Sequence, residues 1–195
     1  MPLNSRNAAQ RPLRADARRN YERLLDEARK VFAESGIDAS LDEIARRAGV
    51  ASGTLYRHFP TRLDLIEAVL GEGVAELAAL GRELRGEPDS AAAVAMWLRT
   101  AVGHALGFRG LSAAVLNSAL DGGPELVARW HAEMFEVGGA LLDKARTDGV
   151  VTAAVADADV LRMIGGIAWA AQQAPDPRAR AEALLDILLR ALGPD

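Results

Sequence analysis

The sequence predicts an all-α protein, for three reasons. Apolar residues recur at spacings of three and four along most of the 195 residues, as on one face of a helix, and strand-like alternation does not recur. Capping residues, glycines and prolines interrupt this pattern at intervals that suit about nine helices. Half of the residues are apolar, so the chain can bury a sizeable core.

The first strong helix ends at residues 34–36, which read Glu-Ser-Gly. Its apolar face consists of Tyr21, Leu24, Leu25, Ala28, Val31 and Phe32. A shorter helix follows, because Ser40 and Glu43 form an S-x-x-E capping box and Gly49 can take the left-handed conformation that ends a helix.

A third helix is expected from Ser52 to His58, ahead of Pro60. Two short helices joined by about four residues, with a glycine in the turn, match the helix-turn-helix of DNA-binding proteins, whose second helix enters the major groove. Leu55 and Phe59 are expected to face inward. The residues left to face outward are Ser52, Gly53, Thr54, Tyr56, Arg57 and His58.

These outward residues suit contact with DNA. Gly53 has no side chain and lets the backbone approach a duplex, while Ser52 and Thr54 can bond base edges or phosphates. Phosphate oxygens are the expected partners of Tyr56, His58 and Arg62. An ordinary helical hairpin, in which the same geometry serves only packing, is the alternative.

The net charge of −4 is unevenly distributed. Residues 1–65 carry 12 Lys or Arg and 9 Asp or Glu, a net of +3, whereas residues 66–195 carry 11 and 18, a net of −7. Residues 1–15 are predicted to form a basic flexible arm near phosphate, with a solvated tail as the alternative. Cysteine is absent and no apolar run approaches the roughly 18 residues of a membrane span, so a cytoplasmic protein without a membrane partner is expected.

The run DEIARRAGVASGTLYRHFPTRLDLIEAV, residues 42–69, and the preceding VFAESGIDASL resemble the DNA-binding domain of the tetracycline-repressor (TetR) family of bacterial transcriptional regulators. The resemblance covers about residues 17–70. It implies a helix-turn-helix domain at residues 16–65 and a ligand-binding and dimerisation domain at residues 66–195. It also implies that the operator, which is double-stranded DNA, is faced by Ser40, Ser52, Gly53, Thr54, Tyr56, His58 and Arg62.

The C-terminal half carries no comparable motif, so periodicity and capping are the guides. Helix starts are expected at Thr61 with Asp64, at Asp157, and at Asp176, which precedes a proline. A short helix is expected to end near Asp121.

The last two helices are apolar over more than one face, which a single core does not require. A second copy that meets this surplus in a four-helix bundle would bury it, and a twofold dimer suits a palindromic operator. A helix buried on all sides within a monomer is the alternative. The expected interface residues are Ile164, Ile167, Leu185, Leu188 and Leu189.

Aromatic and polar residues among the middle helices suggest a cavity for an unknown small-molecule effector. Each of them can instead be an ordinary core or surface residue. The candidates are Trp97, His104, Phe108, Asn117, Trp130, Met134 and Trp169.

The sequence contains no nucleophile elbow, P-loop, dinucleotide fingerprint or zinc-protease motif, and three histidines without cysteine make a poor metal set. No catalytic residue, metal or cofactor is therefore expected. The prediction is a homodimeric transcriptional regulator, acting as a repressor that an effector releases. The alternatives are a helical adaptor that binds protein rather than DNA, and a small-molecule enzyme.

Overall fold

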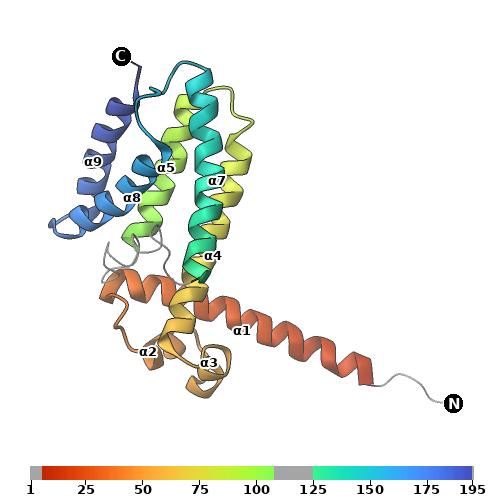
Figure 1. Ribbon diagram of the computed structural model, residues 1–195. Helices are drawn as coiled ribbons and strands as arrows, with labels where there is room; N and C mark the ends of the chain where they lie inside the picture. The colour runs from red at the N-terminus through yellow and green to blue at the C-terminus, as the bar shows by residue number, and fades with distance from the viewer. Residues whose placement is uncertain (1–5, 108–124, 195) are drawn as a thin grey trace. The chain divides into compact units, whose positions relative to one another are not determined.

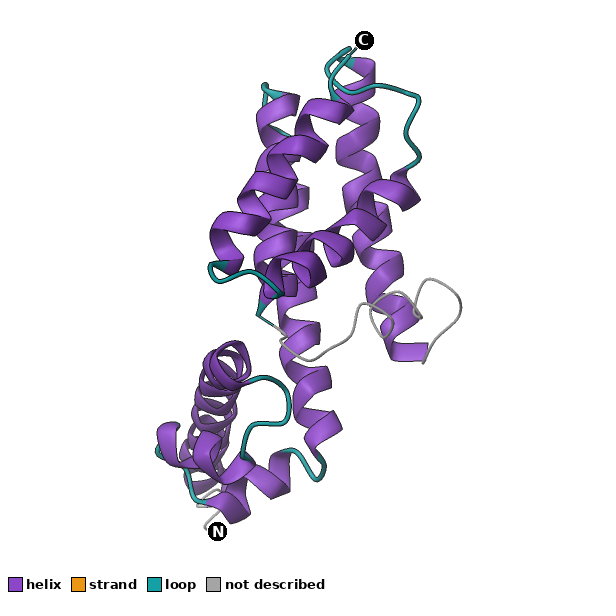
Figure 2. Ribbon diagram, turned by 90° about the vertical axis from the view of Figure 1, so that its left-hand side faces the viewer, coloured by secondary structure: helices purple, strands orange, loops and turns teal. Residues whose placement is uncertain are grey.

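A computed structural model describes residues 6–107 and 125–194, with side chains for residues 16–107 and 132–194. All regular elements in these ranges are helices (Figure 2), which confirms the all-α prediction. None of the described helices is long and apolar enough to cross a membrane. The short helix expected to end near Asp121 lies outside the described residues. The helices are α1 (Arg6–Ser35), α2 (Leu41–Arg47), α3 (Ser52–His58), α4 (Arg62–Leu84), α5 (Ser90–Leu106), α7 (Glu125–Thr147), α8 (Asp157–Gln172) and α9 (Pro177–Leu192).

The chain divides into two compact units, Met1–Val69 and Leu70–Asp195, and the boundary falls within α4. In the first unit α1 packs against α2 and α3, and α2 packs against α3. The core of this unit draws on all four of its helices. Its completely buried side chains are Leu24, Ala28, Phe32, Ile44, Leu55, Leu65 and Val69.

The start of α1 differs from the expected flexible arm. Residues 6–15 form the first turns of a helix that continues to Ser35. Alanine, arginine, glutamine and leucine, which are strong helix formers, make up eight of these ten residues, and the other two are Asn7 and Pro12. The basic N-terminal residues from Arg6 onward are therefore carried on a helix.

Two of the predicted helix starts follow local signals. Thr61 and Asp64 cap α4 reciprocally, with 2.7 Å from Thr61 N to Asp64 Oδ2 and 3.2 Å from Asp64 N to Thr61 Oγ1. The Asp176 carboxylate accepts from Ala179 N at 3.1 Å, directly before Pro177 at the first position of α9. Both starts are confirmed, because each depends on residues within one turn.

The expectation that Asp157 caps a helix is wrong. Asp157 is the first residue of α8, and the cap position is held by Ala156, which has no side-chain cap bond. The Asp157 carboxylate instead accepts from Arg146 Nη2 at 2.6 Å. Arg146 lies on α7, so packing of α7 against α8 supplies a partner that competes with the helix amides.

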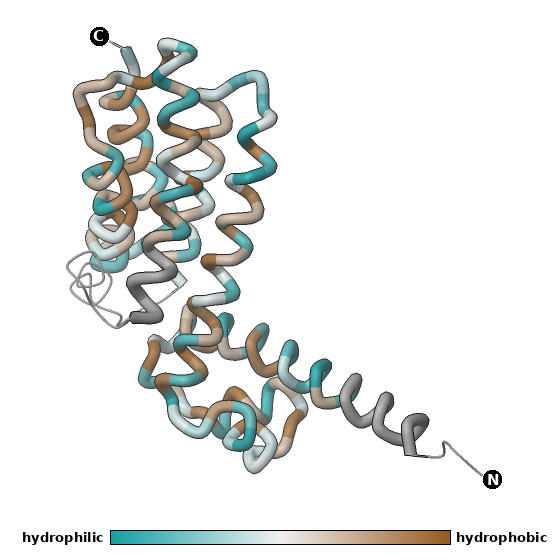
Figure 3. The backbone as a smooth tube through the Cα atoms, turned by 45° about the vertical axis from the view of Figure 1, so that its right-hand side comes forward, coloured by the Kyte–Doolittle hydropathy of each residue, from teal (hydrophilic) through white to brown (hydrophobic). Residues whose placement is uncertain are grey.

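The second unit contains a bundle in which α5 packs against α7, α8 and α9, and α8 packs against α7 and α9 (Figure 1). Hydrophobic and hydrophilic positions alternate along these helices in Figure 3, as expected for helices with one buried face. The predicted periodicity thus corresponds to real packing faces.

Trp97 lies at the centre of this second core and is 2% exposed. Its Nε1 donates to the Leu77 carbonyl of α4 at 3.1 Å. Glycines leave room for the indole on both sides. A Cβ on Gly81 would lie 2.8 Å from Trp97 Nε1, and one on Gly138 would lie 2.6 Å from Trp97 Cη2. The indole therefore packs closely against α4 and α7.

Candidate nucleic-acid interface

α3 presents one face to the core and the other to solvent. Leu55 and Phe59, the second just beyond the helix, are 0% and 2% exposed and attach α3 to the first unit's core. Tyr56 is 45% exposed, and a Cβ placed on Gly53 would meet nothing within 4 Å. The other residues predicted to face outward are Arg57, which is exposed, and Ser52, Thr54 and His58, which are half-buried.

The turn before α3 is closed by backbone hydrogen bonds. Val50 N donates to Ala45 O at 2.9 Å, and Gly49 N donates to Arg46 O at 3.2 Å. Gly49 has φ +65°, as predicted, a conformation that glycine adopts without the steric penalty of a Cβ. These bonds close the end of α2, and α2 and α3 pack against each other, so the helix-turn-helix is built from local contacts.

Ser40 and Arg62 occupy the starts of two neighbouring elements. Ser40 is the exposed cap of α2, and its Oγ accepts from Glu43 N at 3.4 Å. Arg62 begins α4, and its Nη1 donates to the carbonyls of Ile37, at 2.7 Å, and of Ala39. Sequence reasoning missed these two bonds, because the acceptors lie 25 and 23 residues earlier in the chain.

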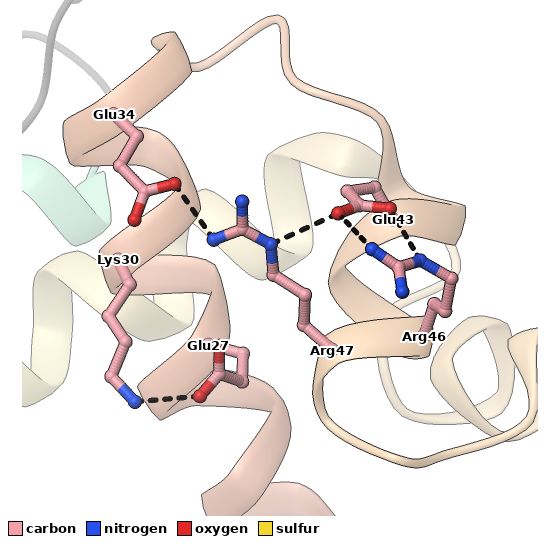
Figure 4. Close-up of polar contacts among 6 residues, drawn as sticks. All are labelled: Glu27, Lys30, Glu34, Glu43, Arg46 and Arg47. Atoms are coloured by element: carbon pink, nitrogen blue, oxygen red, sulfur yellow. Dashed lines mark hydrogen bonds and ion pairs between the residues drawn. The ribbon is translucent and has the colours of Figure 1, made fainter.

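An ion-pair network joins α1 to α2 (Figure 4). Arg47 Nη1 lies 2.8 Å from Glu34 Oε2, and Arg47 Nε lies 3.0 Å from Glu43 Oε1. Arg46 bonds the same Glu43 carboxylate through Nε at 2.8 Å and Nη2 at 2.6 Å. Hydrogen bonds from Arg46, and then from Arg47, lower the pKa of Glu43 to about 2. The Glu43 carboxylate therefore accepts from the two arginines. Of the predicted capping box, the bond from Glu43 N to Ser40 Oγ forms.

Three aromatic rings meet where α1 passes the end of α3. The Tyr21 ring centroid lies 5.7 Å from that of His58 and 5.2 Å from that of Phe59. Tyr21 was predicted on the apolar face of the first helix, yet it is 36% exposed. Two features of the sequence indicate the edge of the core: Tyr21 lies one turn before Leu24, and its ring ends in a polar hydroxyl.

The second unit places the predicted effector residues in different surroundings. Trp97 is buried with its indole N–H bonded, whereas Trp169 on α8 is 54% exposed. His104 and Met134 are half-buried, and His104 Nε2 lies 4.0 Å from Glu76 Oε2. Phe108 and Asn117, and the side chain of Trp130, lie outside the described residues.

The predicted dimer residues lie within the chain's own core. Their exposed fractions are 5% for Ile164, 3% for Ile167, 1% for Leu185 and 8% for Leu188, and Leu189 is half-buried against the same cluster. Residues so buried in one copy have little surface left for a partner. The large apolar side chains that stay exposed on these two helices are Met163 at 45%, Trp169 at 54% and Ile187 at 56%.

Two family profiles match the chain. Residues 24–69 match the profile "Bacterial regulatory proteins, tetR family". Residues 89–194, more than half of the chain, match "Transcriptional regulator SbtR-like, C-terminal domain". The chain belongs to the TetR family. It is therefore a DNA-binding transcriptional regulator of the helix-turn-helix type and not an enzyme, as predicted. The part of the chain that the structure describes contains no group of acidic and histidine residues able to hold a metal ion.

Individual transcriptional regulators resemble the chain to different extents. TtgW of Pseudomonas putida, an uncharacterized HTH-type transcriptional regulator, is 46% identical over 57 residues, which are 29% of this chain and 42% of TtgW. The TetR regulator SCO0520 from Streptomyces coelicolor is 37% identical with a TM-score of 0.70, over 89% of this chain and 98% of that one. A TetR regulatory protein from Mycobacterium vanbaalenii is 29% identical with a TM-score of 0.63, over 93% and 99%.

Proposed function

We propose that this TetR-family protein binds a palindromic operator as a homodimer and represses transcription until a small-molecule effector releases it. The observation that supports operator binding best is the attachment of α3. Leu55 and Phe59 hold it by one face, while the surface at Gly53 is open. A rigid helix whose backbone a duplex can approach suits the major groove. Operator DNA as the partner implies that the protein acts in the cytoplasm.

The candidate DNA contacts of the first unit fall into two groups, those suited to base edges and those suited to phosphates. Short side chains at the start of α3, Ser52 and Thr54, suit base edges, and Gly53 lets the backbone come close. Longer donors suit phosphate oxygens, which set the register of the protein on the duplex. The proposed phosphate contacts are the longer donors Tyr56, Arg57 and His58, together with Ser40 at the exposed start of α2. Arg62 is left out of this set, because its Nη1 already donates to Ile37 O and Ala39 O.

Dimer formation is supported by the exposed apolar residues of α8 and α9. These two helices pack against each other, and Met163, Trp169 and Ile187 leave large apolar side chains in solvent. Exposed apolar side chains on two adjacent helices suit a self-complementary interface around a twofold axis. The proposed interface therefore uses these three residues, with Leu189 at its edge.

The proposed effector site lies in the second unit, Leu70–Asp195, whereas the recognition helix α3 lies in the first. His104 combines a titratable ring with half-burial, and Met134 adds a flexible apolar side chain. Trp97 is a poorer candidate, since Leu77 O already accepts its only donor.

Selection of genomic fragments bound by the full chain tests the proposal. The enriched sites should be palindromes with half-site centres about 10 base pairs apart or a multiple of that. Thr54→Ala should cost about 1–3 kcal/mol at one base pair and relax the preference there, while Tyr56→Ala should weaken binding to all sequences. Met96→Ala, at a 52% exposed side chain of α5, is the control. Failure to enrich any sequence, with no salt-dependent DNA binding, would contradict the proposal.

A further inference from the structure

We propose that Arg62 is a positioning residue, which ties the loop between α1 and α2 to the start of α4 and so sets the place of Ser40. The proposal rests on the proposed function, because Ser40 and α3 are its candidate operator contacts. Arg62 Nη1 donates to Ile37 O at 2.7 Å and also to Ala39 O. One nitrogen thus joins two peptide groups of a single loop to the first residue of α4.

The loop ends at the residue that Arg62 is proposed to position. Its backbone bond from Ala39 N to Gly36 O, at 3.2 Å, closes the loop on itself and does not reach α4. The two bonds from Arg62 do reach α4, and their second acceptor, Ala39 O, directly precedes Ser40. Movement of this peptide group would therefore move Ser40.

The other end of the bridge is also held. Thr61 N and Thr61 Oγ1 each lie 2.7 Å from Asp64 Oδ2, so the first turn of α4 is capped. Leu65, the next residue, is completely buried in the core of the first unit. Arg62 therefore extends from a fixed backbone, and its bonds can transmit that position to the loop.

Lysine at this position would keep the charge and lose the bridge. A guanidinium is planar, weakly hydrated and presents its donors in a fixed fork, whereas an ammonium is a strongly hydrated point charge on a flexible stem. Arg62 is half-buried, where that difference matters more than at a fully hydrated site. An Arg62→Lys variant should therefore release the loop while the charge near the operator is unchanged.

Operator affinity measured across salt concentrations separates positioning from charge. Arg62→Lys should bind the operator about two- to tenfold more weakly, the effect of about one net hydrogen bond, with an unchanged log–log salt slope. The active fraction of each preparation is measured by stoichiometric titration, so that only folded molecules are compared. Arg18→Lys is the matched control, because Arg18 is exposed and bonds Glu22 one turn away on the same helix. It should leave affinity and slope unchanged.

Hydrogen exchange tests the bridge without DNA. The amides of residues 37–41 should exchange faster in Arg62→Lys and Arg62→Ala than in the wild type, because the loop opens more often. Unchanged exchange there, or an Arg62→Lys protein that binds operator like the wild type at every salt concentration, would overturn the proposal. A wild-type protein that bound no DNA would contradict the proposed function, and the exchange rates would still decide whether the bridge exists.

Discussion

The Tyr21 ring meets the His58 ring edge to face, with centroids 5.7 Å apart and ring planes at 69°. This geometry lies in the favourable range for aromatic pairs. Tyr21 belongs to α1 and His58 is the last residue of α3. The contact therefore restricts, from outside the helix-turn-helix, a side chain that is a candidate phosphate donor.

Removing the Tyr21 ring should weaken operator binding. Tyr21→Leu should reduce the free energy of operator binding by up to about 0.5–1.5 kcal/mol, the usual contribution of an aromatic pair. Tyr21→Phe should reduce it much less, because the ring remains. Affinities from fluorescence anisotropy, measured also in a His58→Ala background, complete a double-mutant cycle. An equal loss from Tyr21→Leu in both backgrounds would show that Tyr21 does not act through His58.

A side chain at Gly138 should destabilise the second unit. The Cβ of Gly138→Ala would lie 2.6 Å from Trp97 Cη2, and overpacking of this kind typically costs about 1–3 kcal/mol. Gly103→Ala is the control, since its Cβ would meet nothing within 4 Å on the helix that carries Trp97. It should stabilise the protein by about 0.5–1 kcal/mol. Urea unfolding followed by circular dichroism measures both, and equal stability of Gly138→Ala and wild type would contradict the close packing.

A charge at Ile187 should prevent dimer formation without unfolding the chain. Ile187 is 56% exposed in one copy, so Ile187→Asp places its carboxylate in water in the monomer and in an apolar interface in the dimer. Sedimentation velocity should show monomers for this variant and dimers for Met96→Asp, which alters a similarly exposed residue of α5. A stable Ile187→Asp dimer would place the interface elsewhere.

The Glu43 network should make stability depend on pH in the acid range. The pKa of Glu43 falls from 4.5 to about 2 on folding, so its carboxylate contributes stability above pH 4.5 and loses that contribution as the pH falls toward 2. The side chain is 36% exposed, and solvent screening keeps the effect small. Urea midpoints of wild type and Glu43→Gln should differ at pH 7 and converge below pH 4.5. Glu87→Gln, at a carboxylate outside the network, is the matched control. A gap between the urea midpoints of wild type and Glu43→Gln that is as large at pH 2.5 as at pH 7 would contradict this account.

The ends of several helices could be predicted because their causes are local. Gly49 ends α2 with φ +65°, and Asp176 caps α9 through Ala179 N. Each signal involves residues within about five positions of one another, so the sequence alone contains the partners. The same reasoning predicted that Leu55 and Phe59 face inward, since helical spacing assigns them to one face.

The sequence by itself determined the helices, their apolar faces and the helix-turn-helix, whereas only the tertiary structure decided which apolar residues are core and which polar groups meet. Trp97 and Trp169 have the same chemistry on similar helices, yet one is 2% exposed and the other 54%. Periodicity says that a face is apolar, but the packing of α5 against α8 and α9 decides how much of that face is covered. Arg62 binds carbonyls 25 and 23 residues away, a proximity that exists only once the first unit has folded.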